Sequence, residues 1–223
     1  MIRLPRLLFV TLAVVAAPLA AQEYKVVKSD APPPTDALAP EIAGLLAPSG
    51  YKISQGDRAV CELWLCKEWP IAADAKTTAE INYPLTPGQV FGALRFARKN
   101  ADFRDQEVAA GVYVLRYSQQ PVDGAHVGTF PTRDFCALLP AAKDQLAAVV
   151  DYKTLTTLSK EATGTAHPGI RPLLKAQAGE APAIRSDEEK MWTIVRLTGK
   201  TRQGAAAVKD LPIELVIAGK AAE

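Results

Sequence analysis

The sequence lacks the short motifs that mark the common enzyme classes. Its 223 residues contain no Gly-x-Ser-x-Gly elbow, no phosphate-binding P-loop, no Gly-x-Gly-x-x-Gly, no His-Glu-x-x-His and no Cys-x-x-Cys. These absences weigh against serine hydrolases, P-loop nucleotide-binding proteins, zincin metalloproteases and thioredoxin-like proteins. There is also no internal repeat and no block of like charge.

The sequence also lacks an excess of charge of either sign. It has 26 Lys and Arg residues against 24 Asp and Glu, and Arg3 and Arg6 are the only charged residues of the first 21. Without that segment the formal charge is about zero, so the chain has no basic excess for nucleic acid or an anionic membrane. A hydrophobic content of 48% excludes an intrinsically disordered chain.

No hydrophobic run is long enough for a membrane-spanning helix. Arg3 and Arg6 precede an uncharged stretch, residues 7–17, and a small-residue end, residues 18–21. Eleven residues at about 1.5 Å each reach about 16 Å, half of a bilayer core. We therefore expect residues 1–21 to be a signal peptide. The mature protein is then exported to the periplasm or beyond, without a transmembrane anchor.

Cysteine is scarce, with three residues in a compartment that favours disulfides. Cys61 and Cys66 flank a predicted strand, which separates them by roughly 16 Å and places them on opposite faces. They are not expected to bridge each other. Cys136 has the right chemistry to pair with either, but three small buried hydrophobic residues are the favoured interpretation.

The remaining chain is dominated by segments with alternating polarity. Residues 22–40 form a proline-rich arm with a short predicted strand at 25–28, and residues 41–223 form one domain. A helix capped by Thr35 or Asp36 is expected before Pro48, and a second begins after Asp151 and ends near Ala162. Predicted strands lie at 51–53, 59–69, 89–96, 111–117, 135–139, 170–174, 191–198 and 211–218. This pattern predicts an all-β fold with peripheral helices: an antiparallel β-sandwich with Greek-key or jelly-roll connections.

Three stretches carry a resemblance to a known group of proteins. Residues 111–117 (GVYVLRY), 121–128 (PVDGAHVG) and 131–135 (PTRDF), with the signal peptide and the later His167-Pro168, resemble uncharacterised exported bacterial proteins. The resemblance covers residues 40–219. It implies a β-rich fold and export, and it carries over no active-site residue.

Both histidines lie in predicted loops, and this motivates a metal hypothesis. His126 lies in the long segment 118–133, and His167 lies in the glycine-flanked segment 163–169. With Asp123 or Asp134 they would form a site of two nitrogens and one carboxylate for a divalent metal, which could support a metal-assisted hydrolase. The alternative is that both histidines are surface residues and that Asp134 accepts hydrogen bonds from Thr132 or Arg133.

A second hypothesis is an aromatic platform for a sugar or peptide, and a third is a structural module. The platform would use Trp64 and Trp69, together with Trp192. Its candidate ligand-binding set also includes Arg116, Tyr117, Thr132 and Arg133. The alternative is that the tryptophans belong to the core. In the third hypothesis an envelope partner binds a sheet edge or the proline-rich arm. We expect a binding or structural module of the envelope, with the ligand or protein partner open.

Overall fold

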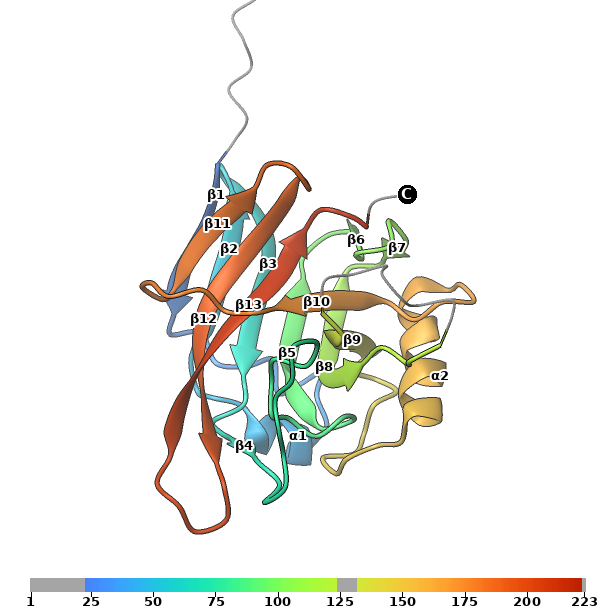
Figure 1. The fold of residues 1–223 in the computed structure, drawn as a ribbon. Helices are drawn as coiled ribbons and strands as arrows, with labels where there is room; N and C mark the ends of the chain where they lie inside the picture. The colour runs from blue at the N-terminus through green and yellow to red at the C-terminus, as the bar shows by residue number, and fades with distance from the viewer. Residues whose placement is uncertain (1–22, 124–131, 222–223) are drawn as a thin grey trace, which may run out of the picture.

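The computed structural model describes residues 23–123 and 132–221, so the expected signal peptide lies outside the described residues. Two helices and thirteen strands are found in them, as Figure 1 shows. The first strands are β1 (Tyr24–Ser29), β2 (Gly50–Gln55), β3 (Arg58–Leu65), β4 (Trp69–Pro70), β5 (Val90–Phe96), β6 (Asn100–Ala101) and β7 (Glu107–Val108). The others are β8 (Gly111–Gln119), β9 (Asp134–Pro140), β10 (Ile170–Leu174), β11 (Ala183–Asp187), β12 (Trp192–Arg202) and β13 (Lys209–Ala218).

Most of these strands belong to one continuous sheet. Its order is β1-β2-β3-β5-β8-β9-β10-β13-β12-β11, β4 pairs with β12, and β6 and β7 form a separate small ribbon. All pairs along this path are antiparallel, and only β4 pairs in parallel. The expected strand at residues 25–28 is thus part of β1, at the sheet edge.

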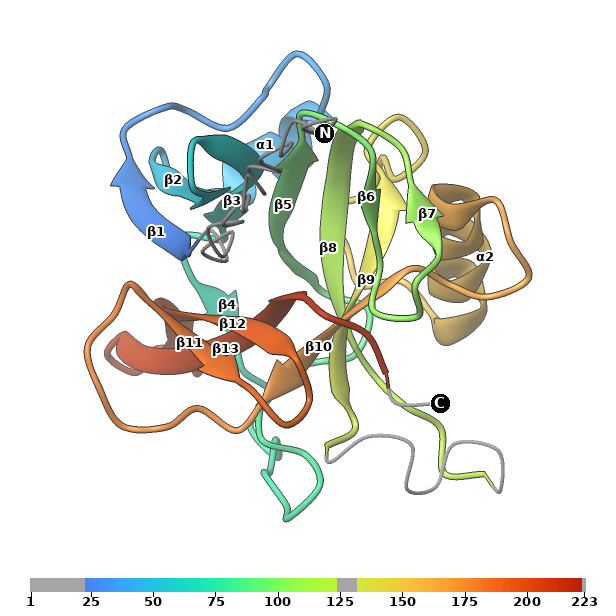
Figure 2. The ribbon, with the colours of Figure 1, turned by 90° about the horizontal axis from the view of Figure 1, so that it is seen from above.

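The sheet curls until its two edge strands meet. β10 makes the bend, because residues 170–172 pair with β9 whereas Leu173 and Leu174 pair with β13. The edges β1 and β11 contact each other without a ladder of hydrogen bonds, as Figures 1 and 2 show. The prediction of a β-dominated fold is confirmed, whereas a sandwich or jelly-roll topology is not.

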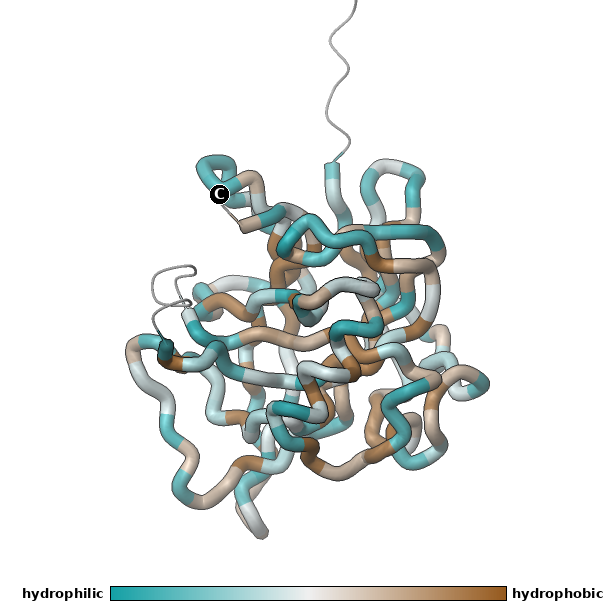
Figure 3. Tube along the Cα trace, turned by 90° about the vertical axis from the view of Figure 1, so that its right-hand side faces the viewer, coloured by the Kyte–Doolittle hydropathy of each residue, from teal (hydrophilic) through white to brown (hydrophobic). Residues whose placement is uncertain are grey.

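The curled sheet encloses the main core. In β13 the apolar residues Ile213, Leu215 and Ile217 face inward, as their alternation predicts, and meet Leu63 of β3 and Leu115 of β8 in one buried cluster. In Figure 3 the peripheral loops are largely hydrophilic and the hydrophobic segments lie toward the centre. The interior is therefore apolar, and a charged group inside it needs an explanation.

The two helices lie outside the sheet. α2 (Tyr152–Thr163) confirms the predicted cap, because the Asp151 side chain accepts a hydrogen bond from the Thr154 amide at 2.7 Å. α1 (Pro40–Leu45) begins later than predicted: Thr35 and Asp36 precede it, and its N-cap is Ala39. Pro40 explains the difference, since proline fits the first turn of a helix and breaks its interior.

The three cysteines are free and buried, which agrees with their interpretation as small core residues. Burial raises the pKa of the Cys61 and Cys66 thiols to about 12. No helix within residues 23–123 and 132–221 has the length and hydropathy to cross a membrane.

Candidate functional site

A cavity of about 190 Å³ lies at one open end of the curled sheet. Two of the elements around it, the start of β1 and the strand β6, lie in the upper part of Figure 1. One wall comes from the start of β1 and the β2–β3 hairpin, through Tyr24 and Arg58. The opposite wall comes from the connection between β5 and β6, which contributes Arg98 and Asn100, and from the end of β13. The cavity thus lies between parts of the chain that are far apart in sequence.

The electrostatic character of this cavity is positive. Arg58 and Arg98 are exposed, and neither side chain makes an ion pair or a hydrogen bond with a described residue. Lys99 pairs with Glu107 at 2.7 Å, but both side chains are more than 60% exposed, so water screens this pair. No lining residue is acidic.

A buried guanidinium lies beneath the cavity wall. Arg171 of β10 points to the interior together with Leu173, is 2% exposed, and has its guanidinium 5.6 Å from the centre of the Phe96 ring. Its Nη2 donates to Asn100 Oδ1 at 3.2 Å and to the Ala101 carbonyl. No carboxylate among the described residues lies within ion-pair distance, and burial lowers its pKa.

Asp102 is the carboxylate whose charge acts on Arg171, and its oxygens already accept hydrogen bonds from other groups. Asp102 accepts hydrogen bonds from the amides of Arg104, Gln106 and Ile170 and from the Gln106 side chain, at 2.9–3.1 Å. A carboxylate with four donors is satisfied where it is. Asp102 therefore acts on Arg171 electrostatically, without a hydrogen bond between the two side chains.

The buried arginine fixes the orientation of Asn100 in the cavity wall. Asn100 Oδ1 accepts from Arg171 Nη2 and, at 2.8 Å, from the Ala101 amide. The atom that accepts these two hydrogen bonds must be the oxygen of the Asn100 side chain, because an amide nitrogen cannot accept them. The other terminal atom is therefore the nitrogen. That NH2 group donates to no described residue. Asn100 therefore offers the cavity a donor.

The hydroxyl of Tyr24 interacts electrostatically with both the exposed Arg58 and the buried Arg171. Burial raises the pKa of this hydroxyl, while the charges of Arg58 and Arg171 oppose this shift. Both guanidinium groups are therefore close enough to act on the same phenol oxygen. The hydroxyl remains a neutral donor at physiological pH.

The residues of the metal hypothesis are not all placed by the structure. His126 lies outside the described residues. His167 is exposed and lines a second cavity of about 260 Å³ with Tyr152 and Lys160. Burial and then the charge of Asp123 raise the pKa of Tyr152, which places Asp123 in the same region. Within residues 23–123 and 132–221, no group of three ligand-type side chains could hold a metal ion.

Asp134 points away from His167. Phe135 lines the His167 cavity, and consecutive residues of β9 face opposite sides of the sheet. Asp134 is 1% exposed and accepts hydrogen bonds from Tyr117 Oη and the Asn82 amide, both at 2.6 Å. It is not bonded by Thr132 or Arg133, the expected donors. Burial raises its pKa, and these hydrogen bonds only partly offset that effect.

The other polar residues of the ligand hypothesis support loops. Arg116 is fully buried and pairs with Asp144, and Tyr117 is bound to Asp134. Thr132 donates to the Leu173 carbonyl at 2.8 Å, and Arg133 Nε donates to the Gln120 carbonyl at 2.8 Å. These contacts connect β9 to its surroundings and leave no common polar surface among the four side chains.

The tryptophans are core residues in the structure. Trp64 is 1% exposed and donates to the Ala31 carbonyl of the arm, and Trp69 is fully buried and stacks on Phe91 with ring centres 4.7 Å apart. Trp192 is 5% exposed and donates to the Lys220 carbonyl. The rings of Trp64 and Trp69 therefore present no face to solvent.

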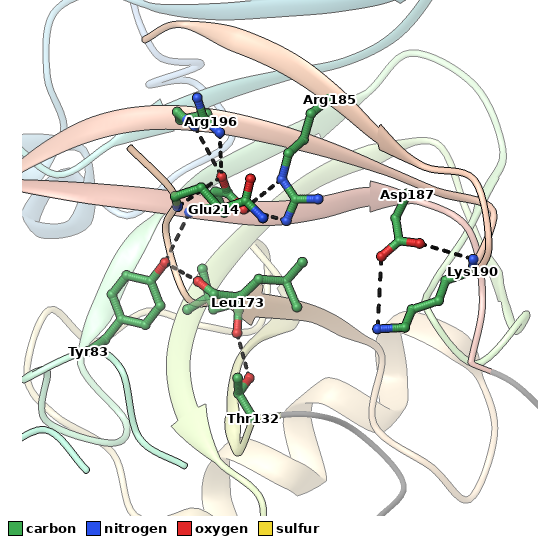
Figure 4. Close-up of polar contacts among 10 residues, drawn as sticks. Tyr83, Thr132, Leu173, Arg185, Asp187, Lys190, Arg196 and Glu214 are labelled. Carbon is green, nitrogen blue, oxygen red and sulfur yellow. Dashed lines mark hydrogen bonds and ion pairs between the residues drawn. The ribbon is translucent and has the colours of Figure 1, made fainter. Parts of the chain in front are cut away.

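A second charged cluster lies on β13, and Figure 4 shows its contacts. Glu214 is fully buried and accepts two hydrogen bonds from each of Arg185 and Arg196, at 2.6–3.0 Å. Its Oε1 also accepts from the Gln177 amide, and its own amide donates to Tyr83 Oη. Both carboxylate oxygens are used, so this cluster holds the connection between β10 and β11 against the sheet.

No family model, curated protein or solved structure matches this chain. The candidate site therefore depends on the geometry of this chain alone.

Sequence reasoning missed this cavity, although part of its signal was visible. The segment 95–99 is the densest basic stretch of the sequence, and its position at the end of a predicted strand favours a solvated strand end. That holds for Arg95, which pairs with Glu62 and lies over Trp64, whereas Arg98 lines the cavity. Arg171 and Leu173 are two residues apart in the same predicted strand and therefore face the same side. If Leu173 faces the core, Arg171 faces it too.

Proposed function

We propose that this chain is an exported binding module of the bacterial envelope that holds a small soluble ligand in the cavity between β1, the β2–β3 hairpin and β13. One observation carries the proposal: Arg58, Arg98 and Asn100 line one cavity, and their side-chain nitrogens donate to no described residue. Polar groups that converge on a recessed volume are typical of ligand sites.

The size of the cavity limits the ligand. About 190 Å³ is less than the roughly 300–1,000 Å³ of sites for drug-sized molecules. It corresponds to about six water molecules at about 30 Å³ each. The proposed ligand is therefore a small molecule, or one compact group of a larger molecule whose remainder stays in solvent.

Native mass spectrometry of the protein purified from its own envelope tests this proposal. Ala59 is half-buried and lines the cavity, so Ala59→Trp fills it, whereas Ala73→Trp adds the same side chain in an exposed loop. We expect a retained small mass in the wild type and in Ala73→Trp, and its loss in Ala59→Trp with unchanged circular dichroism. A wild-type spectrum without any bound mass, or a mass that Ala59→Trp retains, contradicts the proposal.

A further inference from the structure

The buried arginine of β10 has no ion pair with a described residue, and its charge meets only the face of the Phe96 ring and the charge of Asp102 beyond ion-pair distance. Arg116, the other fully buried arginine, forms a bidentate pair with Asp144, and Arg185 and Arg196 share Glu214. Arg171 instead makes two hydrogen bonds to neutral oxygens, and its remaining N–H groups donate to no described residue. A buried charge without a direct ion pair is costly, and an anion bound nearby would offset that cost.

The direction in which that anion must lie follows from the neighbours of Arg171. On the interior side are apolar residues, Phe96 and Leu173, and the thiol of Cys61 is held neutral by its raised pKa. On the outer side are Asn100, Ala101 and Tyr24, all of which line the cavity. The field of Arg171 is therefore screened least toward the cavity, where Arg58 and Arg98 add to it.

The donors at this site fit a tetrahedral dianion better than a carboxylate. Asn100 and Tyr24 each bring a side-chain donor to the lining of the cavity, and Arg58 and Arg98 line it from different parts of the chain. Guanidinium groups match phosphate oxygens in pairs, and the charges of Arg58, Arg98 and the underlying Arg171 are balanced better by two negative charges than by one. Asp57, which lines an adjoining depression with Arg58 and Arg98, is exposed, so water screens its charge. The volume accommodates a phosphate group with a short substituent.

We infer that the cavity binds the phosphate group of a small phosphomonoester, with Arg58, Arg98, Tyr24 and Asn100 as its contacts and Arg171 as the residue that orients Asn100. This inference rests on the proposed binding function and names its ligand class. Free inorganic phosphate presents the same group, so the experiment compares the two sources.

Isothermal titration calorimetry of the mature protein, at constant ionic strength, is the test. The probes are glycerol 3-phosphate, inorganic phosphate, sulfate and acetate. We expect glycerol 3-phosphate to bind at least as tightly as phosphate, sulfate to bind more weakly at a pH where phosphate is a dianion, and acetate to bind least. If phosphate alone binds, the inference of a monoester fails. If neither phosphate compound binds at millimolar concentration, the assignment of the ligand class fails.

Asn100→Asp is the decisive variant, because it keeps the acceptor for Arg171 and replaces the donor by a negatively charged oxygen. We expect it to weaken phosphate binding by about tenfold or more, a loss typical of one charge-assisted contact. Arg58→Gln and Arg98→Gln should each weaken it by about three- to tenfold on the same grounds. Arg202→Gln removes an exposed arginine paired with Glu68 and should leave binding unchanged.

Arg171 needs a separate readout, since its replacement can prevent folding. Arg171→Lys keeps the charge but loses the two-oxygen contact, so we expect weaker phosphate binding than in the wild type with a cooperative thermal transition. Equal phosphate affinities for the wild type and Asn100→Asp overturn the inference even if Arg171→Lys does not fold. A neutral mass that co-purifies and disappears in Ala59→Trp, without phosphate binding, refutes the phosphate inference and leaves the proposed function standing.

Discussion

The ion pair between Arg116 and Asp144 gives a stability prediction that can be worked out from its contacts. Arg116 is fully buried and Asp144 is 1% exposed. Arg116 Nε and Nη2 donate to the two Asp144 oxygens at 2.6 and 2.8 Å. Its remaining N–H groups donate to the carbonyls of Gly88, Leu146 and Ala148. The guanidinium therefore holds the loop from Ala141 to Val150 against the sheet.

Asp144→Asn keeps the shape of the side chain and removes its charge. The guanidinium then remains buried without a counter-ion, which typically costs about 3–5 kcal/mol. The carbonyls that stay bonded to Arg116 place the expected loss near the lower end of this range. For a domain of this size, each kcal/mol lowers the melting temperature by about 2–4 °C, so the expected decrease is at least about 6 °C.

Urea denaturation and thermal circular dichroism at pH 7 measure this loss, with Asp210→Asn as the control. Asp210 pairs with Lys200 at 3.2 Å, but the two side chains are 67% and 58% exposed. Such a surface pair contributes about 0–1 kcal/mol. If Asp144→Asn costs no more than Asp210→Asn, burial does not determine the strength of these pairs, and the reasoning applied to Arg171 also fails.

Two further predictions concern buried titratable groups. The pKa of Asp134 is raised in the folded state, so the folded state binds this proton more tightly than the unfolded state. The wild type should therefore gain stability relative to Asp134→Asn as the pH falls from 7 toward the ordinary Asp pKa of about 3.9. Urea titrations at both ends of this window measure the difference, and a constant difference would contradict it. The thiols of Cys61, Cys66 and Cys136 are buried and free, so a thiol reagent should react slowly with the native protein but modify all three thiols in denaturant. A reductant should not shift the unfolding midpoint, because there is no disulfide among these cysteines to reduce. Fast reaction of the native protein would show that the thiols are accessible.

Alternation and caps predicted the local structure well because both are local in sequence. The strand at 170–174 has the predicted bounds, and α2 starts after its predicted cap Asp151. α1 begins later than predicted because Pro40 at its first position is a stronger start signal than the caps Thr35 and Asp36. The curl of the sheet depends on β10 pairing with β9 and β13 at different residues, and no local pattern reports this. Hence strands were predictable and the topology was not.

The same distinction explains why the cavity was missed. Tyr24, Arg58, Asn100 and Arg171 belong to four separate segments, and they approach only because the sheet curls. Residue type was also misleading. Trp64, Trp69 and Arg116 have the chemistry of a ligand site, but the fold uses their size and hydrogen-bonding capacity in the interior. Such residues indicate a site only when their exposure is known.

The distribution of buried charge gives the strongest reason to regard the open end of the sheet as functional. Arg116 and Glu214 have counter-ions with near-ideal geometry, and the buried carboxylates Asp102 and Asp134 accept several hydrogen bonds each, whereas Arg171 has two hydrogen bonds and no ion pair. Hydrophobic residues of similar volume would fill the space of Arg171 at lower cost, because its neighbours in the core are apolar. A residue that weakens the fold in this way is expected where its charge acts on something outside the fold. Asn100, which lines the cavity and whose side-chain oxygen is held by Arg171, is the contact through which that charge can act.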